Sequence, residues 1–545
     1  MPAYREDISA GRARKRLIIA GGAVLTVVIT VFGVLQLLPS GDNAKPATAA
    51  DEPATALTAT ELTNEFLNEL TAGDAAAAGK LTDDAAAATK QLGDVWQGLA
   101  PTSLVASRDE LVEPAAGATV AVEPFTLSWD LGDGRAWEYK SSLRLARKGA
   151  DWLVRWQPGI VHPNLAAGQR LVLHDLTGQP AVVGRGGAPL ITWTGDGTTA
   201  KDPRFAPLLL PAMGRVARGR TPADGWYVAS ANAAGKDVRV LHGRPTKPLA
   251  STLSQPVQAA AQTAVDGQAA PTMIVAIQPS TGDLLAVAQN AAAGDDLVAL
   301  HGLFPPGSTF KIATATALLD AGIAGIETVV PCPGSATIGQ RTVRNAGFEL
   351  GDVPLRTAFA QSCNTTFAMQ AAKLPPGALP RAASRLGLAA DFAIPGIKTE
   401  AGTVPAAANS TEQVENSIGQ GRVVASCFGM ALVAATVAAG RAITPRLWRD
   451  LKTTVNAGYE PPPGAVVASL RTMMRDVVTS GRGSALDRYG DVHGKTGTAQ
   501  FDDGTQAHGW FAGYRGDLAF ATLVKDSSSS SAAVTVTGAF LGGIG

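Results

Sequence analysis

The sequence contains few of the residues that bind metal ions or build disulfide frameworks. Its 545 residues include three cysteines and six histidines. The cysteines, Cys332, Cys363 and Cys427, form no C-x-x-C pair, and the histidines show no ligand spacing, which argues against a structural zinc site. We expect no metal and no cofactor. Three cysteines allow at most one internal disulfide, and the sequence does not select the pair.

A surplus of positive charge is also absent. Lysine and arginine together number 46, as do aspartate and glutamate, so the formal net charge is zero. Proteins that bind nucleic acids usually carry a basic surface, and we therefore expect no nucleic-acid partner. The length exceeds that of one domain and predicts about two to four domains.

Residues 17–38 form an apolar run without a charged residue, directly after a basic cluster between residues 12 and 16. A helix of roughly 22 residues is ~33 Å long, enough to cross a ~30 Å hydrocarbon core. Basic residues favour the cytoplasmic side, so we expect a single-pass protein of the cell membrane. In it, residues 1–16 face the inner membrane surface and the body lies outside the cell. A cleaved signal peptide is the alternative, and it also exports the body.

The next residues predict a linker and then a compact α+β module. Residues 39–57 are rich in Ala, Pro, Thr and Asp, as is typical of a tether. Apolar residues then recur at helical spacing from Ala59 to the stop at Gly73, and later alternate as in strands. We predict helices followed by an antiparallel sheet over residues 58–165, with the tryptophans in its core. The finer elements expected are a helix at 75–80, strands at 125–129, 137–145 and 152–156, and a hairpin turn at 148–151.

The last part of the chain is predicted to begin at residue 251, after a linker-like stretch at 243–248. Residues 255–265 have the pattern of a helix. Residues 272–277 and 284–288 have the pattern of two buried strands joined by a turn that contains Gly and Asp. This hairpin leads to a serine at a helix start.

Ser308 and Lys311 are predicted to share one face of that helix. Two prolines and a glycine precede Ser308 and do not fit a helix interior, whereas the residues after it are good helix formers. We therefore place Ser308 in the first turn and Lys311 one turn further along. A serine hydroxyl becomes a nucleophile when a base removes its proton, and a lysine with a lowered pKa is such a base. Taken alone, these residues also suit an ordinary helix cap.

Two further motifs follow in a fixed order. Ser362-Cys363-Asn364 lies between apolar helical segments, and Lys495-Thr496-Gly497-Thr498 contains the only Lys-Thr-Gly of the chain. The latter begins a strand whose partner, at 510–514, follows a polar turn at 502–504. An earlier Ser-x-Asn, at 230–232, precedes Ser308 and is excluded by chain order. Because Ser-x-x-Lys, Ser-x-Asn and Lys-Thr-Gly in this order rarely coincide, we predict that they form one site.

Acyl transfer from a peptide needs a nucleophile, a base, a proton donor and an oxyanion site. Ser308 would attack the carbonyl, and Lys311 would take its proton if burial and the charge of Lys495 keep Lys311 neutral. Ser362 would relay a proton to the leaving nitrogen. The backbone N–H groups of Ser308 and Thr498 would form the oxyanion hole.

The remaining motif residues suit substrate binding. Asn364 would hold a backbone amide of the substrate. Lys495 offers a charge, and Thr496 and Thr498 offer hydroxyls, to a C-terminal carboxylate. Gly497 lets the strand edge approach the substrate closely.

The three motifs, in a chain predicted to be exported, resemble those of the class B-type penicillin-binding proteins. Residues 418–421 (Ile-Gly-Gln-Gly) and 426–439 are similar to the same family. The resemblance implies a peptidoglycan D,D-transpeptidase that cross-links stem peptides through an acyl-enzyme on Ser308 and is acylated by β-lactams such as penicillins. It also implies a membrane glycosyltransferase partner. For residues 251–545 it implies a penicillin-binding serine-transpeptidase domain, an α/β fold related to β-lactamases.

The N-terminal half resembles the same family less closely. Residues 152–168 are similar to the end of the nuclear transport factor 2-like (NTF2-like) domain of the methicillin-resistance-type proteins. This resemblance implies an α+β multidomain protein, with an NTF2-like domain at 58–165 and a small pedestal or dimerisation-type module at 166–250. His174 and Leu176 depart from the family, which usually has arginines at these places.

Two other functions stay open. A β-lactamase or D,D-carboxypeptidase of the same fold is the first, because a β-lactamase needs a second base for water, and Glu412 and Asn416 have the spacing of such a site. They adjoin residues 418–421, however, which favours the transpeptidase. A non-catalytic extracellular sensor of β-lactams or muropeptides is the second, and it would not need intact Ser-x-Asn and Lys-Thr-Gly motifs.

Overall fold

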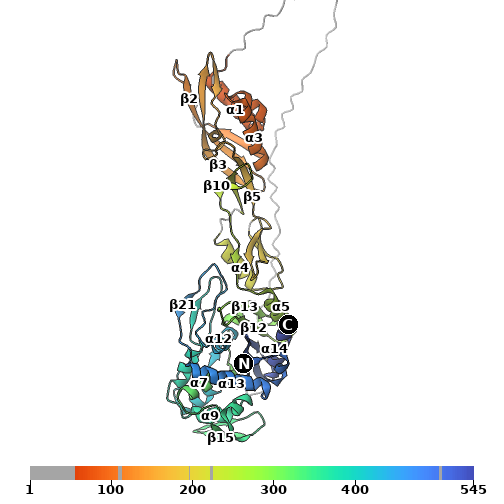
Figure 1. Ribbon diagram of the computed structural model, residues 1–545, viewed down its shortest axis with the longest axis vertical. Helices are drawn as coiled ribbons and strands as arrows, with labels where there is room; N and C mark the ends of the chain where they lie inside the picture. Colours follow the sequence, from red (N-terminus) through yellow and green to blue (C-terminus); the bar gives the residue numbers. More distant parts are fainter. Residues whose placement is uncertain (1–55, 109–112, 196, 221–224, 502–505) are drawn as a thin grey trace, which may run out of the picture. The chain divides into compact units, whose positions relative to one another are not determined.

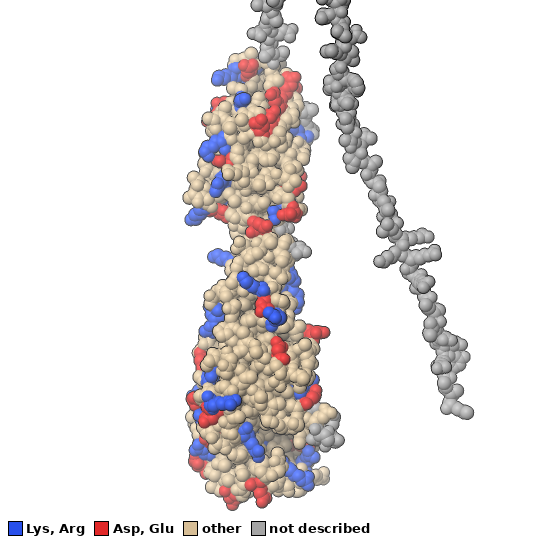
Figure 2. All heavy atoms as spheres, turned by 90° about the vertical axis from the view of Figure 1, so that its right-hand side faces the viewer, with Lys and Arg blue, Asp and Glu red and all other residues tan. Residues whose placement is uncertain are grey.

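The computed structural model describes residues 56–108, 113–195, 197–220, 225–501 and 506–545 (Figure 1). The predicted stub and membrane segment, most of the linker, and the turn at 502–504 lie outside the described residues. No helix within the described part of the chain is both long and apolar enough to span a bilayer. Basic and acidic side chains are both spread over the face in Figure 2, in line with the zero formal net charge.

The first described segment packs helices against a four-stranded antiparallel sheet of order β1-β2-β3-β4. Its helices are α1 (Ala59–Ala72), α2 (Ala75–Lys80) and α3 (Ala85–Leu99), with the 3-10 turn η1 (Pro158–Ile160) at its end. Its strands are β1 (Ser103–Ser107), β2 (Val120–Asp130), β3 (Ala136–Lys148) and β4 (Asp151–Val154).

Local sequence explains this segment. The first helix begins with a capping box: the N–H of Glu61 donates to Thr58 Oγ1 at 3.2 Å, and the N–H of Thr58 donates to Glu61 Oε2 at 2.9 Å. Strand β2 alternates buried and outward residues, and its inner face joins the helices in one core with Trp129, Trp137 and Trp152. The predicted α+β module, tryptophan core and β3–β4 hairpin are confirmed. Strands β2 and β3 are longer than predicted, β4 ends two residues earlier than predicted, and β1 was not predicted.

Two small sheets follow, with the orders β10-β9-β5 and β11-β6-β7-β8. Their elements are β5 (Arg170–Asp175), β6 (Pro180–Val183), β7 (Pro189–Trp193), β8 (Thr198–Ala200), α4 (Leu209–Arg218), β9 (Trp226–Ala231), β10 (Asp237–Gly243) and β11 (Leu249–Ala250). The domain boundaries at residues 165 and 250 stay predictions.

The last part is built on a five-stranded antiparallel sheet of order β13-β12-β24-β23-β22. These strands are β12 (Thr272–Ile277), β13 (Leu284–Gln289), β22 (Val492–Phe501), β23 (Gln506–Arg515) and β24 (Leu518–Val524). The predicted strands at 272–277 and 284–288 are confirmed. Strand β22, which carries the Lys-Thr-Gly motif, pairs only with β23 within this sheet and so forms one edge.

The elements around this sheet complete the fold. The helices and 3-10 turns are α5 (Gln255–Asp266), η2 (Ala291–Ala293), α6 (Val298–His301), η3 (Gly307–Phe310), α7 (Lys311–Asp320), α8 (Leu355–Ala360), α9 (Asn364–Ala371), α10 (Ala378–Arg385), α11 (Ser410–Ser417), α12 (Cys427–Ala439), α13 (Gly464–Thr479), η4 (Ser484–Tyr489) and α14 (Ser531–Ile544). The short strands are β14 (Val329–Cys332), β15 (Ser335–Ile338), β16 (Arg341–Arg344), β17 (Gly351–Pro354), β18 (Asp391–Ala393), β19 (Gly402–Thr403), β20 (Val424–Ala425) and β21 (Thr454–Ala457).

Helices cover both faces of the five-stranded sheet. Along β12, Met273, Val275 and Ile277 belong to one core cluster, which includes helix α12. Ile274 and Ala276 belong to another cluster, which includes α5 and α14. Because both faces are covered, the central strands are continuously apolar rather than alternating with polar residues.

Candidate active site

Ser308 lies where a tight turn meets the edge strand β22. It occupies the 3-10 turn η3, which runs directly into α7, so the predicted helix start is correct but its first turn is 3-10 rather than α. Gly307 adopts a positive φ of 52°, and a Cβ there would lie 2.4 Å from the carbonyl oxygen of Thr498. Glycine therefore permits both the backbone conformation and the close approach of the turn to the strand.

Lys311 joins Ser308 to the Ser-x-Asn motif. Its Nζ donates to Ser308 Oγ at 3.1 Å and to Asn364 Oδ1 at 2.7 Å. It also lies 2.8 Å from the carbonyl oxygen and 3.4 Å from the hydroxyl of Ser362. The side chain is fully buried. The predicted contact between the serine hydroxyl and the lysine amine is confirmed.

Ser362 bridges the two buried lysines. It lies in the turn between α8 and α9 with a positive φ of 63°, a conformation that costs a non-glycine residue roughly 1–2 kcal/mol. This backbone places its carbonyl oxygen on Lys311, while Lys495 Nζ donates to its hydroxyl at 2.9 Å. Strained backbone of this kind is common where a site fixes the direction of functional groups.

Strand β22 places the Lys-Thr-Gly motif against the same cluster. Lys495 is fully buried, and its Nζ also donates to the carbonyl oxygen of Thr496 at 2.9 Å. A Cβ on Gly497 would lie 2.8 Å from the carbonyl oxygen of Pro306, so this strand too comes close to the turn before Ser308. The hydroxyl of Thr498 accepts a hydrogen bond from the N–H of Ser530 at 3.1 Å. The structure thus brings all the predicted site residues to one place.

Burial dominates the electrostatics of the two lysines. It lowers the pKa of Lys311 well below its usual value, and the charge of Lys495 lowers it further. Burial also lowers the pKa of Lys495 to about 7, with a smaller effect from the charge of Arg482. Burial and the neighbouring charge therefore both favour the neutral amine of Lys311, and these are the two causes expected from the sequence.

Some of the residues around the site carried no signal in the sequence. Cys332 and Cys363 form a disulfide, and Cys427 is free and buried. Asn345 contacts the Ser-x-Asn turn but belongs to no recognisable motif. Within the described part of the chain, no group of three His, Cys, Asp or Glu side chains could hold a metal ion.

Gln420, from the Ile-Gly-Gln-Gly segment, pairs with the edge of β22. Its side-chain amide donates to the carbonyl oxygen of Gln500 at 3.2 Å and accepts from the N–H of Gln500 at 3.1 Å. An amide side chain thus occupies the ladder position that a further strand would use.

Glu412 and Asn416 make their contacts elsewhere. The carboxylate of Glu412 accepts from the N–H of Ala408 at 2.6 Å and pairs with Arg422, which lowers the pKa of Glu412. Asn416 Oδ1 accepts from the N–H of Arg422 at 3.3 Å. Glu412, in the first turn of helix α11, is thus engaged in a local ion pair with Arg422, and Asn416 contacts the backbone of the same arginine.

Comparisons with known proteins agree with this architecture. Residues 272–542 match the family model of the penicillin binding protein transpeptidase domain, and residues 58–169 match that of the NTF2-like N-terminal transpeptidase domain. The peptidoglycan D,D-transpeptidase PbpA of Mycobacterium tuberculosis is 27% identical over 288 residues, which cover 44% of this chain and 58% of that protein. Its namesake in Mycolicibacterium smegmatis is 29% identical over 304 residues, covering 46% and 61%. The chain thus spans about three fifths of the length of these relatives.

The structure is similar to the solved penicillin G acyl-enzyme complex of penicillin-binding protein A from M. tuberculosis. The two chains have a TM-score of 0.53 and 22% sequence identity, and the match covers 67% of this chain and 98% of that chain. At this identity the likeness shows the fold alone. The fold, with a serine at a helix start beside an edge strand, is that of the penicillin-recognising serine proteins. With both family models matched, the chain belongs to the penicillin-binding proteins that combine a transpeptidase domain with an NTF2-like N-terminal domain.

The approach of Gly307 to β22 gives a test of the local structure. Gly307→Ala is expected to destabilise the protein by more than about 1 kcal/mol, because it adds a clash with the carbonyl of Thr498 to the strain of a positive φ. The matched control is Gly322→Ala, where φ is 64° but no atom lies within 4 Å of the added Cβ. Urea denaturation should show a larger loss for Gly307→Ala, and equal losses would contradict the close approach.

Proposed function

We propose that this protein is a peptidoglycan D,D-transpeptidase that forms an acyl-enzyme on Ser308 and is acylated by penicillins. The observation that carries the proposal is the 3.1 Å contact between Ser308 Oγ and the fully buried Lys311 Nζ. A buried amine with a lowered pKa, within hydrogen-bond reach of a serine hydroxyl, is placed to act as its general base. The names of the PbpA relatives and the acyl-enzyme formed by the solved M. tuberculosis protein support the same reaction.

In the acylation step, Lys311 takes the proton of Ser308 as Oγ bonds to the carbonyl carbon of the penultimate residue of a stem peptide. The negative oxygen of the tetrahedral intermediate would be held by the N–H groups of Ser308 and Thr498, and such donors lower the barrier by about 3–4 kcal/mol each. When the C–N bond breaks, the leaving nitrogen takes a proton through Ser362, whose hydroxyl lies between the two lysines. An amine of a second stem peptide then attacks the ester and releases Ser308.

Substrate binding is assigned to the edge strand. Lys495 in its charged form, with the hydroxyls of Thr496 and Thr498, would bind the terminal carboxylate of the peptide or the carboxylate of a penicillin. Gly497 keeps the strand free of a side chain where it approaches the turn before Ser308. Asn364 would contact a backbone amide of the substrate while its Oδ1 accepts from Lys311.

The contacts of Glu412 favour transfer to an amine over rapid hydrolysis. A β-lactamase needs a base that activates water at the acyl-enzyme, whereas the carboxylate of Glu412 is engaged by Arg422 and Ala408. The partners of Lys311 and Lys495 in the described part of the chain are hydroxyl, carbonyl and amide oxygens, with no carboxylate among them. Hydrolysis by a β-lactamase or carboxypeptidase stays the second candidate.

We also propose that residues 17–38 anchor the protein in the cell membrane, with the body outside and a membrane glycosyltransferase as partner. The support is the uncharged run behind a basic cluster, which favours this orientation. Membrane fractions should contain the full chain, and protease added outside spheroplasts should remove the body. Recovery of the protein in the soluble cytoplasmic fraction would contradict this placement.

Ser308→Ala is expected to abolish acylation by a labelled penicillin, since no other group can replace the nucleophile. Intact-protein mass spectrometry should show one adduct on the wild-type protein and none on the variant, and peptide mapping should place it on Ser308. Ser480→Ala, at an exposed serine, is the control and should be acylated like the wild type. An adduct that persists in Ser308→Ala would contradict the proposal.

The acylation rate constant is expected to follow a bell-shaped pH profile. It rises with pH as Lys311 loses its proton, and falls again near pH 7 as Lys495, whose pKa is about 7, loses the charge that binds carboxylate. Lys495→Arg keeps that charge at all these pH values and should move the alkaline limb to higher pH, whatever its effect on the maximum. Lys373→Arg, at an exposed site, serves as the control. An alkaline limb unchanged in Lys495→Arg would refute the assignment.

Glu412→Gln is expected to leave the slow release of bound penicillin unchanged. The reason is that the carboxylate pairs with Arg422 rather than serving the acyl-enzyme. The measurement is the decay of the Ser308 adduct over hours after removal of free penicillin. Rapid decay in the wild type that disappears in Glu412→Gln would identify a β-lactamase instead.

A further inference from the structure

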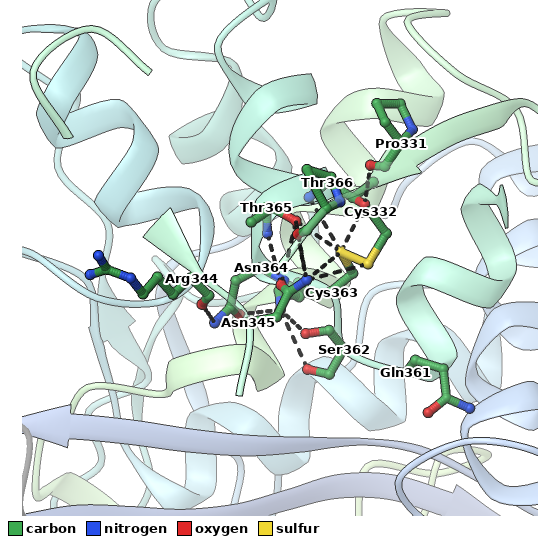
Figure 3. The surroundings of a disulfide bond; sticks show 12 residues. Pro331, Cys332, Arg344, Asn345, Gln361, Ser362, Cys363, Asn364, Thr365 and Thr366 are labelled. Atoms are coloured by element: carbon green, nitrogen blue, oxygen red, sulfur yellow. Dashed lines mark hydrogen bonds between the residues drawn. A yellow bond between two sulfur atoms is a disulfide. The ribbon is translucent and has the colours of Figure 1, made fainter. Parts of the chain in front are cut away.

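A buried asparagine lies behind the Ser-x-Asn turn. Asn345 follows strand β16 and exposes only 8% of its surface. Its Oδ1 accepts from the N–H of Asn364 at 2.8 Å and from the N–H of Thr365 at 3.2 Å. These two N–H groups begin helix α9 and lack partners within the helix, so Asn345 fixes its first turn from outside. Figure 3 shows Asn345 between Asn364 and the disulfide.

The amide nitrogen of Asn345 is also fully engaged. Nδ2 donates to the carbonyl oxygen of Pro333 at 2.9 Å and to Thr365 Oγ1 at 3.2 Å. It further lies 3.4 Å and 3.5 Å from the sulfur atoms of the disulfide partners Cys332 and Cys363. Because both ends of the buried amide have partners, its orientation is determined, and so is the position of the N–H groups that it accepts from.

The residue before Asn345 orients the side chain of Asn364. The carbonyl oxygen of Arg344 accepts from Asn364 Nδ2 at 3.0 Å. With its nitrogen held there, Asn364 turns its Oδ1 towards Lys311 Nζ, 2.7 Å away. A continuous series of hydrogen bonds therefore runs from the end of strand β16 through Asn364 to the amine beside Ser308.

The disulfide ties a second strand to the same turn. It joins Cys332, at the end of β14, to Cys363, the middle residue of Ser-x-Asn, across a sequence separation of 31 residues. The loop that it closes contains the β15–β16 hairpin, which delivers Asn345. Thr366 Oγ1 adds a bond to the carbonyl oxygen of Pro331 at 2.7 Å.

We propose that Asn345 is a positioning residue for acylation: backed by the Cys332–Cys363 disulfide, it holds the Ser362-Cys363-Asn364 turn so that Asn364 and Ser362 face Lys311. The proposal rests on the acyl-transfer function proposed above. Asn345 does not touch the reacting atoms, and its effect passes through Asn364.

The test compares Asn345→Ala with Asn290→Ala. Asn290 is a second buried asparagine, 5% exposed, whose amide bonds Thr272, Gln268 and Ala270 at the far end of strand β12. For each variant, the acylation rate constant with a fluorescent penicillin is measured across pH, together with the melting temperature. Asn345→Ala is expected to slow acylation on the order of tenfold to a hundredfold, as small misplacements of catalytic groups do.

The pH profile separates positioning from general destabilisation. A hydrogen bond from Lys311 to Asn364 favours the ammonium form, so loosening it should shift the acid limb of Asn345→Ala to lower pH. Asn290→Ala should keep the wild-type profile and rate after a similar loss of melting temperature. If Asn345→Ala does not fold, Asn345→Asp and Asn290→Asp are compared instead. Asn345→Asp keeps an acceptor for the N–H of Asn364 but loses the Nδ2 donor to Pro333 and Thr365. Because the side chain is then held at one end only, this variant should acylate more slowly than the wild type.

Two outcomes would overturn the proposal. One is a wild-type rate and profile in a folded Asn345 variant. The other is an equal loss of rate in the matched Asn290 variant. The absence of any adduct on Ser308 in the wild-type protein would instead refute the proposed function.

Discussion

The burial of two lysine side chains against one serine hydroxyl is the constraint on which the rest of the site depends. Lys311 and Lys495 both contact Ser362 and have no solvent exposure. Two ammonium groups in such surroundings would repel each other and lack water, so the fold lowers the pKa of both lysines. Carbonyl, hydroxyl and amide oxygens satisfy the remaining N–H groups, and the aromatic rings of Phe359 and Phe367 lie about 5.6 Å from the two nitrogens.

This constraint explains why distant parts of the chain must meet so closely. One motif comes from each of three places: the turn before α7, the turn between α8 and α9, and strand β22. Gly307 and Gly497 let the turn before α7 and strand β22 approach each other. The positive φ of Ser362 orients the turn between α8 and α9 towards both lysines. The five-stranded sheet, whose two faces are both packed against helices, supports all three.

The sequence predicted the parts of the site that depend on local rules. The prolines and glycine before Ser308 signal a helix start, alternation signals the strands, and three motifs in order signal the cluster. Asn345, Ser530 and the choice of Cys332 with Cys363 act across long sequence separations, where no periodicity or spacing reports the contact. Glu412 and Asn416 show the converse: their spacing suited a base for hydrolysis, but Arg422 engages Glu412 in an ion pair. The spacing of two residues along a helix predicts that they share a face, but it does not predict which residues elsewhere in the chain contact that face.

Among the described strands, β22 pairs with another strand on one edge only, and Gln420 contacts its other edge at Gln500. An extended peptide that hydrogen-bonds along β22 therefore meets an obstacle at one end of the strand. Pairing along this strand edge therefore favours the tip of a chain over a segment from its middle. This suits a protein whose proposed substrates are the free ends of short peptides on a large polymer.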